Sequence, residues 1–477
     1  MVEELARQNP GLNLETLRAQ GGTVVTGQQV GLFGGPLFTA MKAATALSRA
    51  RQATAAGKPH AAIFWLATED HDFAEINHVA FPARRELRTL KYLSAPDAPR
   101  PVGGLVLDET ILPLVEQASE LLGYSDAMQA LEAAYKPGRT LAQAFADFYR
   151  AMFAAQGLLV LDAGSALIHG LGAPVLQSAI DRADELHAAL LERNAALEAA
   201  GYHAQVAVGP ESSLLFLIDE RSGARVALKR HAPSAAEPDG LWQAGRERFS
   251  SADLRGILSA EPARISPSAL LRPVFQDFLL GTSLTIGGPA EIAYFAQSAV
   301  LFEKILDRVT VFEPRFSATL VEPSIAELLR RHELSFERVL AETPDSLAQL
   351  LAARAMPIEG KRLLAAAGNA MDRELEPLLD WMRTVDEGLG RSGSTAASKM
   401  RYQMNRMRRL AANFQLQKEE SLRRHAEAIS LSLYPGGILQ ERVHGAAFCF
   451  ARYGTELAET LTARAVDNCA GHSLVWL

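Results

Sequence analysis

The sequence has few cysteines, no long apolar run and no excess of positive charge, and each absence excludes a class of protein. Only two of its 477 residues are cysteine, Cys449 and Cys469. This number is too small for a disulfide framework and suits a reducing cytoplasm. We expect both cysteines to be buried thiols in apolar surroundings, which is a simpler interpretation than a redox-active pair.

The apolar runs are shorter than the roughly 20 residues that a membrane-spanning helix needs. The first residues, MVEELARQNPG, are acidic and lack the apolar region of a secretory signal. We therefore expect a cytoplasmic protein with no membrane partner. With 48 Lys and Arg against 55 Asp and Glu, the formal net charge is −7, which argues against nucleic acid as a partner.

The chain alternates between strand and helix patterns over most of its length. From Gly22 to about Phe81, a strand–helix–strand order predicts a βαβ unit and hence a parallel sheet. Residues 1–322 are expected to form a Rossmann-like α/β core, interrupted by inserted segments at about 82–150 and 205–264. The final residues, 434–477, are expected to return to this core after a Gly-Gly turn.

Between these parts the composition changes. Residues 323–433 are rich in Leu, Ala, Glu and Arg and repeat with a period of 3.5 to 3.6. This pattern predicts a long antiparallel helical arm of the coiled-coil type, with its turn at Gly388–Ala396. We expect the arm to join two copies of the chain in a homodimer.

A glycine-rich segment, TGQQVGLFGGPLFTAMKA, lies between the first predicted strand and the following helix. Backbone N–H groups of such a turn approach anions at a helix N-terminus. Gln28 and Gln29 are expected to bind a carboxylate or a hydroxyl, and Lys42 either neutralises a carboxylate or is an ordinary exposed helix lysine. The predicted binding residues of this segment are Gln28, Gln29, Gly31, Gly34, Gly35 and Lys42.

Polar residues also follow the second predicted strand, AAIFWLA. Glu69, Asp70, His71 and Asp72 come directly after it, and Asn77 and His78 follow a few residues later. Because the carboxyl ends of parallel strands share one edge of a sheet, this cluster and the glycine-rich turn are expected to form one site.

These motifs, together with GYHAQV, SPSALLRPVFQDFLL, GGPAEIAYFAQ, PRFSATLVE and YPGGILQER, resemble the cysteine ligase family of bacillithiol biosynthesis, BshC. The resemblance covers nearly the whole chain. It implies an enzyme that forms an amide bond between cysteine and the amino group of glucosaminyl-malate. A carboxylate is a poor acylating agent in water, so we expect activation by ATP, with Mg²⁺ carried in by the nucleotide.

Amide formation needs a group that accepts the proton of the amine, and His suits this role near neutral pH. His71 and His78 are the candidates, and Asp70 and Asp72 would orient the ring of His71 and raise its pKa. In the alternative interpretation, one histidine only caps a turn. The spacing of these acids and histidines matches no closed zinc pattern, so no tightly bound metal is expected.

Further substrate contacts are predicted on two helices and one strand end. Arg272, Gln276 and Asp277 share a helix face, which either holds the carboxylates of the malyl group or pairs internally.

Glu291 and Tyr294 follow a second Gly turn, where Glu291 either complements the helix dipole or contacts substrate. Arg315 ends a strand at the same edge and is predicted to bind an anion.

The motif YPGGILQER predicts a second, separate site. Gly436 and Gly437 precede a predicted helix, so their N–H groups would hold a phosphate of ATP or ADP, unless the glycines only break the helix. The predicted nucleotide-binding residues are Tyr434, Gly436, Gly437, Gln440, Arg442 and Tyr453.

Two other functions remain open from the residues. One is a nucleotidyltransferase-like enzyme that adenylates a small acid, although the HxGH signature is absent. The other is a non-catalytic, nucleotide-binding coiled-coil adaptor. A P-loop mechanism is excluded, because the chain has no GxxxxGK[ST] pattern.

Overall fold

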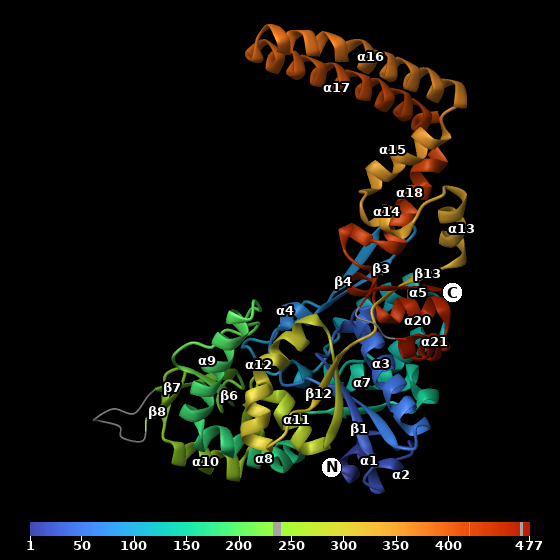
Figure 1. The fold of residues 1–477 in the computed structure, drawn as a ribbon. Coiled ribbons are helices and arrows are strands. Elements are labelled where there is room, and N and C mark those ends of the chain that lie inside the picture. The colour runs from blue at the N-terminus through green and yellow to red at the C-terminus, as the bar shows by residue number, and fades with distance from the viewer. Residues whose placement is uncertain (232–239, 419, 468–470) are drawn as a thin grey trace. The chain divides into compact units, whose positions relative to one another are not determined.

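A computed structural model describes residues 1–231, 240–418, 420–467 and 471–477 (Figure 1). Cys469, predicted to be a buried thiol, lies outside the described residues, whereas Cys449 is buried. The chain forms two compact units. The first comprises residues 1–83, 88–318 and 441–473, and the second residues 84–87, 319–440 and 474–477.

The first unit is built on a five-stranded sheet in which all pairs are parallel. Its strand order is β12-β11-β1-β2-β5. The strands are β1 (Gly22–Gln28), β2 (His60–Leu66), β5 (Leu159–Asp162), β11 (Thr282–Gly287) and β12 (Val311–Pro314). The chain runs outward from β1 through β2 to β5, and then returns to the other side of β1. The direction therefore reverses between β1 and β11, as in Rossmann-like sheets, which confirms the predicted fold class.

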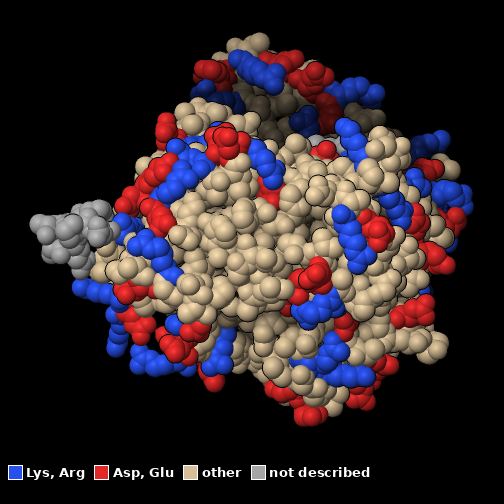
Figure 2. Space-filling model, turned by 90° about the horizontal axis from the view of Figure 1, so that it is seen from below, with Lys and Arg blue, Asp and Glu red and all other residues tan. Residues whose placement is uncertain are grey.

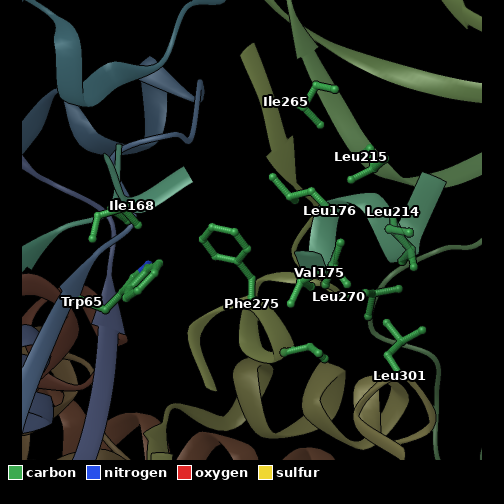
Figure 3. Close-up of a cluster of buried hydrophobic side chains, with 14 of the residues drawn as sticks. Trp65, Ile168, Val175, Leu176, Leu214, Leu215, Ile265, Leu270, Phe275 and Leu301 are labelled. Carbon is green, nitrogen blue, oxygen red and sulfur yellow. The ribbon is translucent and has the colours of Figure 1, made fainter. Parts of the chain in front are cut away.

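Neighbouring residues of β2 face opposite sides of the sheet, as strand geometry requires. On one side, Phe64 packs against Tyr149, with ring centroids 5.0 Å apart. Helices α3 (Leu37–Ala55) and α7 (Leu141–Met152) lie there. On the other side, Trp65 contacts Phe275 at 6.3 Å, within a large buried cluster (Figure 3). This cluster joins the sheet to α8 (Ala166–Asp181), α11 (Arg272–Leu280) and α12 (Pro289–Leu306).

The inserted segments have folds of their own. The first holds the hairpin β3 (His78–Pro82) and β4 (Leu87–Lys91), then α5 (Ile111–Leu122), α6 (Asp126–Ala134) and α7. The second is an antiparallel sheet of order β10-β6-β7-β8-β9. Its elements are β6 (Ser212–Ile218), β7 (Arg225–His231), β8 (Leu241–Ala244), β9 (Glu247–Phe249), α10 (Ser251–Ala260) and β10 (Ile265–Pro267). The remaining helices of this unit are α1 (Val2–Gln8), α2 (Glu15–Arg18), α4 (Phe73–Ile76), α9 (Ala183–Ala199), α20 (Ala446–Tyr453) and α21 (Leu457–Arg464).

The second unit is helical and contains the predicted antiparallel hairpin, formed by α16 (Ile358–Val385) and α17 (Glu387–Lys418). The predicted turn at Gly388–Ala396 is wrong, because only Asp386 interrupts the two helices, with φ −162° and ψ 142°. Gly393 lies within α17, where a Cβ atom would stand 2.7 Å from Sδ of Met382. The glycines of this segment thus allow close helix packing instead of forming a turn.

Shorter helices complete this unit, and a small sheet pairs β13 with β14. These elements are β13 (Ala318–Val321), α13 (Pro323–Arg331), α14 (Phe336–Leu340), α15 (Pro344–Ala355), α18 (Glu420–Leu433) and β14 (Ser473–Trp476), and α19 (Gln440–Val443) begins at the last residue of the segment 319–440 and lies otherwise in the first unit. Among the described residues, no helix is both long and apolar enough to cross a bilayer. Figure 2 shows one face of the molecule, on which acidic and basic side chains alternate around a broad uncharged area.

Candidate active site

A cavity of about 340 Å³ opens at the carboxyl ends of β1 and β11, where the direction of the sheet reverses. Ligands of open α/β sheets bind at this position. The loops that follow β1, β11 and β12 all reach the cavity. The predicted residues that line it are Gln28, Gln29, Lys42, Asp70, Arg272, Glu291, Tyr294, Arg315 and Arg442.

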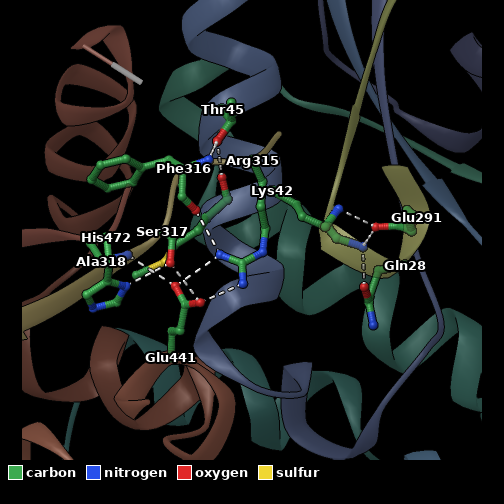
Figure 4. Close-up of polar contacts among 12 residues, drawn as sticks. Gln28, Lys42, Thr45, Glu291, Arg315, Phe316, Ser317, Ala318, Glu441 and His472 are labelled. Carbon is green, nitrogen blue, oxygen red and sulfur yellow. Dashed lines mark hydrogen bonds and ion pairs between the residues drawn. The ribbon is translucent and has the colours of Figure 1, made fainter. Parts of the chain in front are cut away.

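Lys42 is buried at one wall of the cavity, so the interpretation as an exposed helix lysine is wrong (Figure 4). Its ammonium group donates to the carbonyl of Gly27 at 2.9 Å and to Oε1 of Gln28 at 2.8 Å, and it forms an ion pair with Glu291. Burial lowers the pKa of Lys42, and the carboxylate of Glu291 opposes this shift. Glu291 also accepts the N–H of Gly288 at 2.7 Å. Much of the charge of Lys42 is therefore already balanced.

Arg315 reaches the cavity but is held by Glu441 through two hydrogen bonds of 3.0 and 2.6 Å (Figure 4). Both side chains are almost fully buried. Burial disfavours the charged carboxylate of Glu441, but Arg315 together with donors from Ser317 and Ala318 holds its pKa below the usual range. Arg315 thus serves chiefly as a structural partner.

Arg272 and Arg442 differ from the other two cations. Nη2 of Arg272 donates to the hydroxyl of Tyr294 at 2.6 Å. Within the described part of the chain, neither guanidinium takes part in an ion pair. Burial raises the pKa of Tyr294 to about 12, so its phenol is neutral at physiological pH. The cavity therefore offers two guanidinium groups that are outside ion pairs, with the carboxylates of Asp70 and Glu75 in the same lining, and guanidinium groups suit carboxylates.

Asp70 brings negative charge to the opposite wall. Its Oδ2 accepts the amide of Gln29 at 2.5 Å, and its Oδ1 accepts the N–H of His71 at 2.7 Å. Burial opposes ionisation, but these donors and the nearby Arg225 and Arg272 hold the pKa of Asp70 below its usual value. The amide of Gln29 also reaches Glu75 at 3.1 Å, so it is fixed between two acids.

His71 lies beside this wall and does not line the cavity. Its Nδ1 is 3.4 Å from Nη1 of Arg225 and 3.8 Å from Oδ1 of Asp70. Because a guanidinium only donates, we assign Nδ1 as the acceptor, and the proton of the neutral ring lies on Nε2. This tautomer presents an N–H donor at Nε2, and the base role of His71 stays a prediction. Arg225 was missed by sequence reasoning, since nothing marks it within β7.

The other polar residues that follow β2 have local roles. Asp72 caps α4 by accepting the N–H of Glu75 at 3.2 Å. His78 is exposed, with Nδ1 at 3.3 Å from the side-chain oxygen of Asn77, which is buried. None of Asp72, Asn77 and His78 lines the cavity. Asp72 thus caps a helix, a role that the sequence analysis did not predict, and the site roles predicted for Asp72, Asn77 and His78 stay predictions.

The glycine-rich turn does not form the predicted anion site. The N–H of Gly34 donates to the hydroxyl of Tyr135 at 3.2 Å, and the N–H of Gly35 donates to the carbonyl of Leu32 at 3.0 Å. The hydroxyl of Tyr135 in turn donates to the carbonyl of Gly31 at 3.2 Å. The prediction for Gly31, Gly34 and Gly35 is wrong, because the turn is buried against aromatic side chains.

The helix face predicted from Arg272, Gln276 and Asp277 is only partly in the site. Asp277 is 1% exposed and accepts the N–H of Thr282 at 2.7 Å and the hydroxyl of Thr310 at 2.6 Å. It thereby ties α11 to β11. Gln276 is also buried, and neither side chain lines the cavity, so their predicted substrate contacts are wrong.

The residues of the predicted nucleotide site belong to both units of the chain. Gly436 and Gly437 form a turn after α18, and α19 that follows has only four residues. The N–H of Gly437 donates to the carbonyl of Tyr434 at 3.2 Å, which fits the helix-break interpretation, and phosphate binding at this turn stays a prediction. Gln440 is buried, with its amide bonded to the backbone of Leu320. Tyr453 lies at the end of α20, and only Arg442 of this set lines the cavity.

The fold and the site define a Rossmann-like protein with a polar cavity at its topological switch point and a helical arm. Residues 2–316 match the family model described as "Bacillithiol biosynthesis BshC, N-terminal Rossmann-like domain". Residues 318–475 match the model described as "Bacillithiol biosynthesis BshC, C-terminal coiled-coil domain". The chain therefore belongs to the BshC family.

Curated relatives agree with this assignment. A protein of Koribacter versatilis is 40% identical over 97% of this chain and 85% of its own length. A protein of Solibacter usitatus is 33% identical over 100% of this chain and 88% of its own length. A protein of Geobacillus kaustophilus is 29% identical over 98% of this chain and 86% of its own length. Each carries the name "Putative cysteine ligase BshC". Among the described residues, no three His, Cys, Asp or Glu side chains are grouped as metal ligands.

Proposed function

We propose that this protein is a ligase that joins the carboxyl group of L-cysteine to the amino group of glucosaminyl-malate, which yields bacillithiol. Family membership and the names of the relatives support the cysteine ligase activity. The observation that carries the second substrate is the presence in the cavity of two guanidinium groups, those of Arg272 and Arg442, that form no ion pair among the described residues. A malyl group brings two carboxylates, one for each guanidinium.

Amide formation breaks a C–O bond of the cysteine carboxyl group and forms a C–N bond. We propose that ATP, accompanied by Mg²⁺, activates the carboxyl group as an acyl phosphate or acyl adenylate, so that the oxygen leaves on phosphorus. Asp70 then binds the neutral amine of glucosaminyl-malate and accepts the proton that its nitrogen loses as the C–N bond forms, while the Nε2 proton of His71 stabilises the developing oxyanion.

We further propose that the enzyme acts in the cytoplasm as a homodimer joined through α16 and α17. Large apolar side chains on these helices are exposed, among them Trp381 at 59%, Leu410 at 60% and Phe414 at 67%. Exposed apolar side chains in such number mark an interaction surface.

The activity is tested by mass spectrometry of the purified protein with cysteine, glucosaminyl-malate and Mg-ATP, with each component omitted in turn. We expect bacillithiol only in the complete mixture, and the released ADP or AMP identifies the activated intermediate. Pyrophosphate release from ATP and an acid without amide product would favour the nucleotidyltransferase-like alternative. A mixture in which no component is consumed would contradict an enzymatic role and favour the adaptor.

A further inference from the structure

A second cavity, of about 330 Å³, lies at the same edge of the parallel sheet, at the carboxyl ends of β2 and β5. It does not share lining residues with the first cavity. Thr68 and Glu69 contribute from the end of β2, Asp162 from the end of β5, and His169 from α8. None of these residues has a role in the proposed chemistry so far.

The ionisable side chains that line the second cavity are two carboxylates and one histidine. Nε2 of His169 is 2.6 Å from Oε1 of Glu69, and Nδ1 donates to the carbonyl of Ile265 at 2.9 Å. The protonated ring therefore forms an ion pair with Glu69, towards which Arg225 also acts electrostatically. Burial opposes this charge, but Glu69 and the carbonyl of Ile265 raise the pKa of His169.

Asp162 has no such partner. Its Oδ1 accepts the hydroxyl of Thr68 at 2.6 Å and the N–H of Gly164 at 2.9 Å, and both donors are neutral. Within the described residues, no cationic side chain forms an ion pair with Asp162. A cavity with one carboxylate in excess, surrounded by hydroxyl groups, suits a small cation such as a primary ammonium group.

The two cavities share a wall. Glu69 faces the second cavity and Asp70, the next residue, faces the first. Arg225 supports this wall: its guanidinium lies 3.8 Å from the ring centroid of Phe216, and its Nε donates to Ser266 at 3.0 Å. Ser266 lines the second cavity, while Nη1 of Arg225 contacts His71. Ligands in the two cavities are thus separated only by this stretch of chain.

We propose that the second cavity binds the ammonium group of the amino-acid substrate, while the first binds the carboxylates of its co-substrate. The inference rests on the proposed function, under which the amino acid is cysteine. Asp162 attracts the ammonium group of the amino acid to the second cavity. Arg272 and Arg442 attract the carboxylates of the co-substrate to the first cavity. The wall at Asp70 and His71 is where the two reacting groups meet.

Gly104 offers a variant that fills this cavity without removing a polar group. It lines the cavity, and a Cβ atom built there meets no heavy atom within 4 Å. The preceding Gly103 differs, because its Cβ would stand 2.3 Å from Cβ of Thr68. Gly104→Leu is therefore compatible with the fold, and Gly256→Leu on α10, where a Cβ also has open space, is a matched control.

The experiment is isothermal titration of the full chain with L-cysteine under reducing conditions, with and without Mg-ATP. Cysteamine, which keeps the ammonium group, and N-acetylcysteine, which lacks it, are the comparison ligands, and malate reports on the first cavity. We expect cysteine and cysteamine to bind and N-acetylcysteine not to bind. Asp162→Asn and Gly104→Leu should each weaken cysteine binding about tenfold or more, because each removes or blocks a charge-assisted contact.

Malate binding should be unchanged in both variants, which shows that they are folded, and Gly256→Leu should bind cysteine normally. Equal binding of N-acetylcysteine and cysteine would overturn the inference, as would normal cysteine affinity in both variants or no cysteine binding by the unaltered protein. If any of these results is found and the turnover assay still produces bacillithiol, the proposed function is supported and only the role of the second cavity is contradicted.

Discussion

The two cavities at the edge of the parallel sheet are similar in size and differ in their charged groups. The first, between β1 and β11, has both cations and carboxylates in its lining, and Arg272 and Arg442 form no ion pair among the described residues. The second, at β2 and β5, has Asp162 without a basic partner. One sheet edge thus holds two environments, because each cavity takes its charge from different segments of the chain.

This difference shows where charge in such a site originates. The carboxylates of the second cavity come from strand ends, since Asp162 is the last residue of β5 and Glu69 follows β2 by three residues. The guanidinium groups of the first come from α11 and α19, which are far apart in the chain. The residues at the strand ends would by themselves give this edge of the sheet a negative charge. Helices α11 and α19 add positive charge to it at the first cavity.

The largest effect is expected at the wall between the cavities. His71→Gln should lower kcat by about 10²- to 10³-fold, because it removes a donor to the developing oxyanion. Steady-state kinetics measures the loss, while malate and cysteine should still bind. His78→Gln is the matched control, since His78 is exposed and lines neither cavity. Near-normal turnover of His71→Gln would remove His71 from the mechanism.

A smaller effect separates the two cavities. Arg272→Ala should lower kcat/KM for glucosaminyl-malate by about 10- to 100-fold, since a charge-assisted hydrogen bond contributes about 1.5–3 kcal/mol. Cysteine binding should not change, and Arg272→Lys should recover only part of the loss, because it lacks the planar fork. Arg221→Ala, at an exposed ion pair with Glu247, is the control. An equal loss of cysteine affinity would show that the cavities are not independent.

The smallest expected effect is the contribution of His169, in the second cavity, to the pH dependence of the free energy of unfolding. The pKa of His169 is raised in the folded protein, so its pairing with Glu69 stabilises the fold fully below the unfolded pKa of about 6.5. That stability is lost as the pH rises through the folded pKa. The free energy of unfolding should therefore fall as the pH rises through this range, and this part of the pH dependence should be absent in His169→Gln.

Urea denaturation followed by tryptophan fluorescence measures this slope. The chain has four tryptophans, of which Trp381 and Trp476 are exposed. Replacing both with Phe leaves Trp65 and Trp242, which are buried in the first unit, as reporters. A slope of the opposite sign would show that His169 is neutral in the folded protein.

The sequence by itself determined the elements and the edge of the sheet where the site lies. The apolar runs that end at Gln28 and Leu66 predicted parallel strands, and polar residues at their ends predicted a site at one edge. Asp162 lies near the end of the predicted strand GLLVLDA, so the sequence also contained a polar residue at this strand end, which the prediction did not use. The period of residues 323–433 likewise predicted the helical hairpin, because periodicity is a local property of the chain.

Only the tertiary structure decided which side chains meet and which charges are balanced. The glycines after β1 pack under Tyr135 instead of binding an anion, and Lys42 and Arg315 are paired by Glu291 and Glu441. Arg225 enters the wall from the inserted sheet, and Arg442 joins Arg272 from the far end of the chain. Such pairings depend on contacts between segments hundreds of residues apart, so no local pattern in the sequence could reveal them.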